Sequence, residues 1–142
     1  TTLAWDEFAK KAGDGEYSAG WIAGGYPKPW VDKDVVKLAA KFEFLVVADL
    51  FENDLMKGAA VVLPSCSWAE REGSFVNHAG RIQPFERAID PPDGAKQDGQ
   101  FLYELAGFEG LYRAGRVREL MAATMPAFAE LCEAPGMPVH AH

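Results

Sequence analysis

The chain has 142 residues, of which 49% are apolar and 25% charged, and it carries a net charge of -7 at pH 7. This length and apolar content suit one soluble domain with a buried core. The acidic balance argues against a nucleic-acid partner, because such partners select clusters of Lys and Arg. No apolar run reaches the roughly 18 residues of a membrane-spanning helix. Because the first residue is Thr1 rather than Met, we expect the chain to be a piece of a longer polypeptide.

Short apolar stretches alternate with segments of helical periodicity in the first half of the chain. We expect helices at residues 5–13, 32–41 and 52–57, and strands at 19–23, 42–49 and 59–64. Strands that alternate with helices predict a β-α-β-α-β unit of the α/β class, with parallel neighbours and right-handed crossovers. The run from Phe44 to Ala48 is apolar without alternation, which is typical of a strand covered by helices on both faces.

Three residues mark where these elements begin or end. Gly13 stands where the first helix would take a left-handed residue at its C-terminus. The side chain of Asp32 can cap the free amides of the second helix. Pro64 ends the third strand, because proline has no N–H to donate to a neighbour.

The loops that follow the three strands cover residues 24–30, 49–54 and 65–72. In a parallel sheet all three meet at the carboxyl edge, which is where open α/β sheets bind ligands. Gly24 and Gly25 allow a close approach either of a phosphate or of a neighbouring segment, and the pattern leaves both uses open. They do not continue into the GxGxxG pattern of a dinucleotide-binding loop.

The second half of the chain predicts a different architecture. A short hairpin is expected at residues 74–89 with a turn at Asn-His-Ala-Gly, followed by a loop at 90–99. Helices are expected at 100–107 and at about 114–131, the second disturbed by Pro126. We therefore expect a sheet domain with its terminal hairpin at residues 1–90, and a loop with a helical tail at 91–142.

The candidate catalytic and metal-binding residues each have a simpler structural interpretation. Glu70 and Glu72 could act as acid and base, but carboxylates two residues apart point to different sides of a helix, and solvated acids are favoured. His78 lies in the predicted turn, and His140 and His142 lie near the C-terminus. We therefore assign no catalytic and no metal-binding residue.

Two cysteines, Cys66 and Cys132, cannot build a four-thiolate iron-sulfur or zinc site by themselves. Reduced, buried thiols are the favoured interpretation. A disulfide between the two stays open.

The segment from Phe44 to Pro92 carries a specific pattern. A buried strand, a short helix and a Val-Val-Leu-Pro strand precede E-x-x-G-[ST]-x-x-N-x-x-G-R-x-Q, whose positions are Glu70, Gly73, Ser74, Asn77, Gly80, Arg81 and Gln83. Over roughly residues 19–107 the chain resembles the molybdopterin oxidoreductase superfamily. Within it, the chain is most similar to the C-terminal part of the large iron-sulfur subunit of NADH:quinone oxidoreductase.

This resemblance implies a set of cofactor contacts. Catalytic members hold a molybdopterin guanine dinucleotide at the carboxyl edges of such sheets, and the matching residues here are Gly24, Gly25, Asp49, Ser65, Asn77, Gly80 and Arg81. The chain departs from the catalytic pattern twice, with Tyr26 in place of an Asn and Ala60 in place of an Asp. Both departures favour a domain without the pterin, in which Arg81 would pair with Glu70 or Glu72 instead of a phosphate.

Three functions follow as hypotheses. The first is a structural domain of the NADH:quinone oxidoreductase subunit, which itself holds no cofactor, while iron-sulfur clusters lie elsewhere in the full chain. The second is part of a molybdopterin-dependent catalytic subunit such as formate dehydrogenase. The third is a free-standing small-molecule-binding domain. The first two imply partner subunits of a redox complex, no nucleic acid, and a cytoplasmic location at the inner face of the cell membrane.

Overall fold

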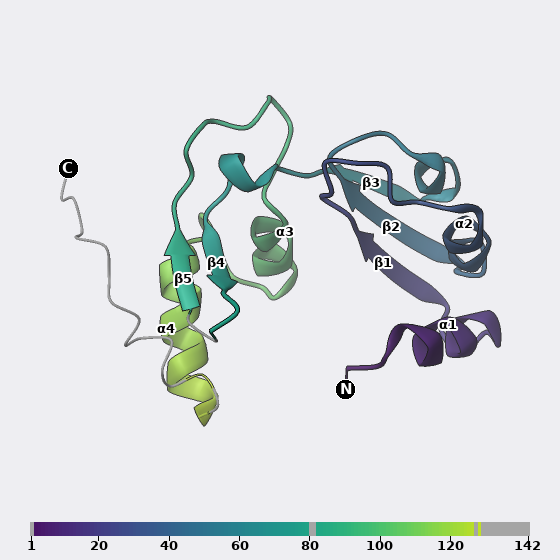
Figure 1. The fold of residues 1–142 in the computed structure, drawn as a ribbon, viewed down its shortest axis with the longest axis horizontal. Coiled ribbons are helices and arrows are strands. Elements are labelled where there is room, and N and C mark those ends of the chain that lie inside the picture. The colour runs from purple at the N-terminus through teal and green to yellow at the C-terminus, as the bar shows by residue number, and fades with distance from the viewer. Residues whose placement is uncertain (1, 80–81, 127, 129–142) are drawn as a thin grey trace. The chain divides into compact units, whose positions relative to one another are not determined.

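A computed structural model describes residues 2–79, 82–126 and 128 of the chain (Figure 1). The residues group into two compact units, which are described one at a time. Unit 1 contains residues 1–66 and 93–96, and unit 2 contains residues 67–92 and 97–142. Within the described residues, no helix has both the length and the apolar character needed to cross a membrane.

Unit 1 is built on a three-stranded parallel sheet in the order β1-β2-β3. The strands are β1 (Ala19–Ala23), β2 (Phe44–Asp49) and β3 (Val61–Pro64). In register, Ala23 lies opposite Ala48, and Asp49 lies opposite Pro64. The three strands therefore end at one edge, as the alternating pattern predicts.

Two α-helices and one 3₁₀ helix accompany this sheet, namely α1 (Trp5–Gly13), α2 (Lys33–Ala39) and η1 (Asp54–Gly58). The predicted cap of α2 is confirmed, since the Asp32 carboxylate accepts from the amides of Asp34 and Val35 at 2.9 Å each. A cluster of buried residues joins the helices to the central strand and makes the core of unit 1: Ala12, Ala39, Phe42, Leu45, Val47 and Leu55.

Three local predictions for unit 1 are wrong in detail. The left-handed glycine after α1 is Gly15, with φ of 79°, and not Gly13, because the helix makes one further turn of hydrogen bonds before it ends. The second helix stops at Ala39 instead of Lys41. The third is a five-residue 3₁₀ helix instead of an α-helix.

Unit 2 contains the predicted hairpin and helices. Its elements are η2 (Trp68–Glu70), β4 (Gly73–Val76), β5 (Ile82–Phe85), α3 (Asp98–Leu105) and α4 (Ala114–Thr124). Strands β4 and β5 are antiparallel, with Val76 opposite Ile82. The α/β class with an added hairpin and helical region is thus confirmed, while the domain division at residue 90 stays a prediction.

Helix α4 is shorter than the predicted 114–131. It ends at Thr124, and the next residue, Met125, is extended with φ of -128° and ψ of 103°. The residue before a proline is driven out of the helical region by the proline ring, so Met125 is not helical and the helix ends at Thr124, two residues before Pro126. The predicted part beyond Pro126 lies outside the described residues except at Phe128.

Candidate functional site

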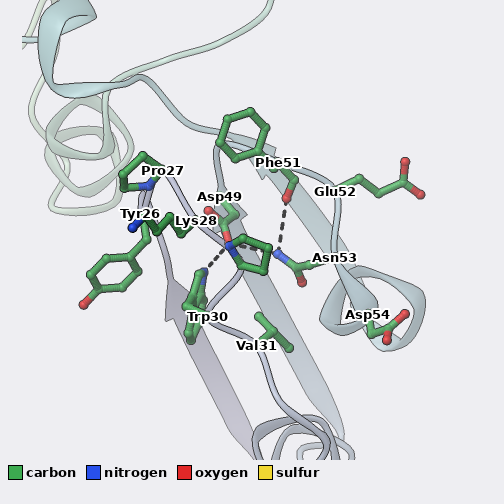
Figure 2. A pocket seen from close by; sticks show the side chains of 11 residues that line it. Tyr26, Pro27, Lys28, Trp30, Val31, Asp49, Phe51, Glu52, Asn53 and Asp54 are labelled. Carbon is green, nitrogen blue, oxygen red and sulfur yellow. Dashed lines mark hydrogen bonds between the residues drawn. The ribbon is translucent and has the colours of Figure 1, made fainter.

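The loops after β1 and β2 line a half-open cavity at the carboxyl edge of the sheet in unit 1 (Figure 2). Its volume is about 520 Å³, within the usual range of small-molecule sites. Its lining comes from two segments, residues 26–31 and residues 49–54 without Leu50. The predicted ligand edge therefore contains a cavity made by two of the three predicted loops.

Asp49, the last residue of β2, organises this cavity. Its side chain is buried, with only 4% of the residue exposed. One carboxylate oxygen, Oδ1, accepts from the backbone amides of Gly25 at 2.9 Å and Leu50 at 2.7 Å. The other, Oδ2, accepts from Trp30 Nε1 at 2.9 Å and Asn53 Nδ2 at 2.8 Å. We call these five residues the Asp49 network.

The network surrounds the buried carboxylate with hydrogen-bond donors, and no Lys or Arg among the described residues forms an ion pair with it. A carboxylate offers about four acceptor positions, and four N–H groups occupy them here. Hydrogen bonds to an ionised acceptor are roughly twice as strong as neutral ones, which offsets the cost of burying the group. In Figure 2 the Trp30 ring and the Asn53 amide approach Asp49 from different sides. The carboxylate thus ties both cavity loops together.

The Gly24-Gly25 pair has a structural explanation in this network. A Cβ on Gly24 would lie 2.3 Å from Oδ2 of Asp49, so any side chain would displace the carboxylate. Gly25 has φ of 107°, a conformation that side chains rarely adopt, and from it the amide reaches Asp49. Packing against a neighbouring segment is therefore one use that the structure shows for both glycines, and the predicted cofactor contact stays a prediction.

Asn53 links the cavity to the core. Its Oδ1 accepts from the amide of Leu55 at 3.1 Å and so caps η1, while its Nδ2 donates to Asp49. Among the described residues, Leu55 is one of the largest fully buried side chains. One amide side chain therefore joins the cavity wall to the helix that covers the core.

The remaining lining residues present groups suited to a planar, phosphorylated ligand. The rings of Tyr26 and Trp30 lie 5.8 Å apart at a tilt of 57°, and Tyr26 and Phe51 expose more than half of their surface. Lys28 brings the one cation of the lining and has no ion-pair partner within the described chain. Aromatic faces can stack on a heterocycle, and an ammonium group can bind phosphate.

Two acids of the lining modify the charge at the rim. Asp54 binds Lys57, an exposed pair that lowers the pKa of Asp54 and raises the pKa of Lys57 through their hydrogen bond and mutual attraction. Glu52 adds a second carboxylate on the same segment. The opening of the cavity therefore combines the ammonium group of Lys28, which has no ion-pair partner among the described residues, with the carboxylates of Glu52 and Asp54. These carboxylates can accept from the N–H groups of a base.

Four of the predicted cofactor residues lie together in unit 1. Gly24, Gly25 and Asp49 are in direct contact, and the amide of Ser65 donates to the backbone oxygen of Asp49 at 3.1 Å. Ser65 itself is buried and pairs with Lys96 in a parallel bridge. The structure thus brings the ends of all three loops to one edge.

The other predicted cofactor residues belong to unit 2. Asn77 accepts from the amide of Ala79 at 2.9 Å, the turn conformation expected for it, and donates to Gln83 at 3.2 Å. Gly80 and Arg81 lie outside the described residues, and so does the predicted pairing of Arg81.

Glu70 and Glu72 have structural contacts in unit 2. Glu70 accepts from the amide of Ser67 at 2.8 Å and completes a capping box on η2. Glu72 lies 3.7 Å from Arg113. Both contacts are local to the structure of unit 2, and the assignment of no catalytic residue stays a prediction.

The thiols and histidines offer no metal centre in the described part of the chain. Cys66 is buried, while Cys132, His140 and His142 lie outside the described residues. His78 lies in the turn of the hairpin, as predicted. No cluster of three or more His, Cys, Asp or Glu side chains suited to a metal occurs among residues 2–79, 82–126 and 128.

The sequence pattern missed Lys28, Trp30 and Asn53 as site residues. Asn53 stands at the N-cap position of a short helical segment, and this alone could have marked it. Trp30 and Lys28 lie in a Pro-rich loop whose residues match no recognisable binding motif. Their roles depend on a contact between two loops that are 19 residues or more apart in sequence.

Comparison with known proteins identifies the class of protein to which this fold and site belong. Residues 5–108 match the family model described as molybdopterin oxidoreductase. The match covers more than half of the chain, and the chain therefore belongs to the molybdopterin oxidoreductase family.

Individual proteins that are similar to this chain include formate dehydrogenases and a nitrate reductase. The chain is 35% identical over 91 residues to the F420-dependent formate dehydrogenase subunit alpha of Methanocaldococcus jannaschii, covering 62% of this chain and 14% of that protein. It is 34% identical over 103 residues to formate dehydrogenase H of Escherichia coli, covering 70% of this chain and 14% of that protein. A nitrate reductase of Symbiobacterium thermophilum is 36% identical over 103 residues, with 70% and 13% covered. The chain thus spans less than a fifth of the length of these relatives.

Proposed function

We propose that the chain is part of a molybdopterin-dependent oxidoreductase related to the formate dehydrogenases and nitrate reductases. In this proposal the carboxyl edge of unit 1 forms one wall of the site for a molybdopterin guanine dinucleotide. Membership of the family supports the cofactor class, and the named relatives support the type of enzyme. The observation that carries the assignment to this edge is the cavity lined by the loops after β1 and β2.

The residues of the cavity fit such a group. The volume of about 520 Å³ accommodates one heterocycle with its sugar and phosphates. Tyr26 and Phe51 offer exposed ring faces for stacking, and Lys28 offers a cation for phosphate. Glu52 can accept from the N–H groups of a guanine base.

These groups indicate which role belongs to this chain and which to the bound cofactor. The bound cofactor would supply the two-electron chemistry at its metal. This chain would bind and orient the dinucleotide portion, and we assign no group on it to proton transfer. The relatives named as alpha subunits suggest partner subunits, and so we propose that the parent protein works in a complex.

Metal and pterin analysis of the full-length protein tests the proposal. We expect molybdenum or tungsten together with a pterin, in a fixed ratio to protein. Lys28→Glu should weaken cofactor retention about tenfold, the effect of losing a charge-assisted contact of about 1.4 kcal/mol. Lys33→Glu, at an exposed position of α2, serves as the control with the same charge change. A full-length protein without metal and pterin would contradict the proposal.

A second candidate function rests on a specific observation. The Asp49 carboxylate has four internal donors, and Tyr26 and Ala60 replace the polar residues of the catalytic pattern. These features favour a structural domain without a pterin, as in the large iron-sulfur subunit of NADH:quinone oxidoreductase. None of the three relatives described above is such a subunit, which is why we place this candidate second. Iron-sulfur clusters without molybdenum, tungsten or pterin in the full-length protein would support it.

A further inference from the structure

We propose that α3 is an interior helix of the parent protein, and that a part of the same polypeptide outside residues 1–142 covers its outer side. This outer side consists of Leu102, Leu105 and Ala106, which are all exposed. The inference rests on the proposed function in one respect only, namely that the chain is part of a longer polypeptide.

The first argument is that α3 is apolar on two opposite sides. On the inner side Tyr103 is 8% exposed, and its ring lies 4.7 Å from that of Phe108 and 6.2 Å from that of Tyr112. On the outer side Leu102 and Leu105, which are three residues apart and therefore neighbours on the helix, are 57% and 70% exposed. A helix with apolar residues on all sides is typically buried, and unit 2 buries only one side of this one.

The second argument is that the outer side of α3 carries no charged side chain. Glu104, the exposed acid of this helix, lies on the side of Gln100, whose Nε2 donates to its carboxylate at 2.9 Å. Helices α1, α2 and α4 instead present at least two exposed charged side chains each, as is typical of helix faces in contact with water. These are Asp6, Glu7 and Lys10 in α1, Lys33, Asp34 and Lys37 in α2, and Arg116 and Glu119 in α4.

The third argument concerns what covers the outer side. Permanent interfaces are more apolar than transient ones and have few charges at their centre, so the composition of this side favours a permanent neighbour. The match covers only 14% of the formate dehydrogenase subunit alpha of Methanocaldococcus jannaschii, and a polypeptide of that size has most of its residues outside this segment. A surface on the same polypeptide has an effective concentration on the order of millimolar, which favours it over a separate chain.

Thiol labelling of the full-length protein tests whether the outer side is covered. Leu105→Cys places a thiol there, and we expect a maleimide to react about tenfold more slowly with it than with Glu119→Cys, at an exposed position of α4 in the same unit. Peptide mass spectrometry distinguishes each site from the other cysteines, and the two rates should become equal in denaturant. Equal rates in the native protein would overturn the inference.

A photoreactive side chain identifies what covers the outer side. In a variant with p-benzoylphenylalanine at position 105, irradiation should join this position to residues of the same polypeptide outside 1–142. Cross-links to a second copy, to another subunit or only to residues within 1–142 would each overturn the inference. Protection of Leu105→Cys that is lost on dilution would overturn it as well, because a contact within one polypeptide does not depend on protein concentration.

These outcomes separate the inference from the proposed function. A full-length protein without molybdenum, tungsten or pterin contradicts the proposed function, while the labelling rates and the cross-links still decide what covers α3. Slow labelling at position 105 together with cross-links outside 1–142 supports the inference in either case.

Discussion

The two compact units of the chain are stabilised in different ways. The core cluster of buried apolar side chains lies entirely in unit 1. In unit 2, the described residues that are buried are Gln100, Tyr103 and Ala114, and polar contacts join the elements. Arg71 binds Asp98 at 2.9 Å, and Gln100 bonds to the backbone of Gly110 and Tyr112.

This difference shows where a rigid site can be built. The Asp49 network rests on loops anchored to an apolar core, so its geometry does not depend on salt or on the charge of a neighbouring cation. The contacts of unit 2 include partly exposed ion pairs, which salt and pH weaken. The cavity therefore lies in unit 1, the unit that is stabilised by an apolar core.

The largest effect should come from the core of unit 1. Leu55→Ala removes a side chain that is 2% exposed and should lower the free energy of unfolding by about 2–5 kcal/mol. Leu111→Ala in unit 2, where the residue is 74% exposed, should change it by less than about 0.5 kcal/mol. Urea denaturation of both variants measures the contrast, and equal losses would show that the core is not confined to unit 1.

A change beside Asp49 should have the next largest effect. Gly24→Ala places a Cβ 2.3 Å from the carboxylate and should cost about 1–3 kcal/mol of unfolding free energy, because the network must shift to accommodate it. Gly58→Ala, which meets nothing within 4 Å, is the matched control and should stay within about 0.5 kcal/mol of wild type. A Gly24 variant as stable as the Gly58 variant would mean that the network tolerates displacement.

The ion pair of unit 2 should contribute less. Arg71→Met keeps the apolar stem and removes the contact with Asp98, whose side chain is partly exposed, and so we expect a loss of about 1 kcal/mol or less. The loss should shrink in about 1 M salt, where charges are screened within about 3 Å. Arg116→Met on the exposed surface of α4 is the control. A loss that persists in high salt would argue against an electrostatic origin.

The smallest effect concerns pH. Burial raises the pKa of Tyr112, and the nearby charge of Glu72 raises it further. Because the folded pKa lies above the unfolded value of about 10, the phenol contributes stability below pH 10 that is lost as the pH rises through the folded pKa. Melting temperatures between pH 9 and pH 11 should therefore fall less steeply in Tyr112→Phe than in wild type. Identical slopes would exclude Tyr112 as the cause.

Much of unit 1 follows from local pattern. The continuous apolar run predicts β2, the Asp32 cap predicts α2, and the proline predicts the end of β3. Errors occur where two nearby glycines could each take the left-handed conformation after a helix, as Gly13 and Gly15 could after α1. Only the hydrogen bonds of the last helical turn select between them. In unit 2, the turn at Asn77 and the end of α4 before Pro126 both follow from backbone restrictions that a sequence displays.

The sequence by itself determined the α/β class, the parallel pairing of neighbouring strands and the family to which the E-x-x-G-[ST]-x-x-N pattern points. It also placed Gly24, Gly25, Asp49 and Ser65 at one edge, since parallel strands end together. Only the tertiary structure decided what Asp49 does. Leu50 and Asn53 follow Asp49 in the same loop, but Gly25 and Trp30 belong to a loop that lies 19 to 24 residues earlier, and local propensities carry no information about such a long-range contact.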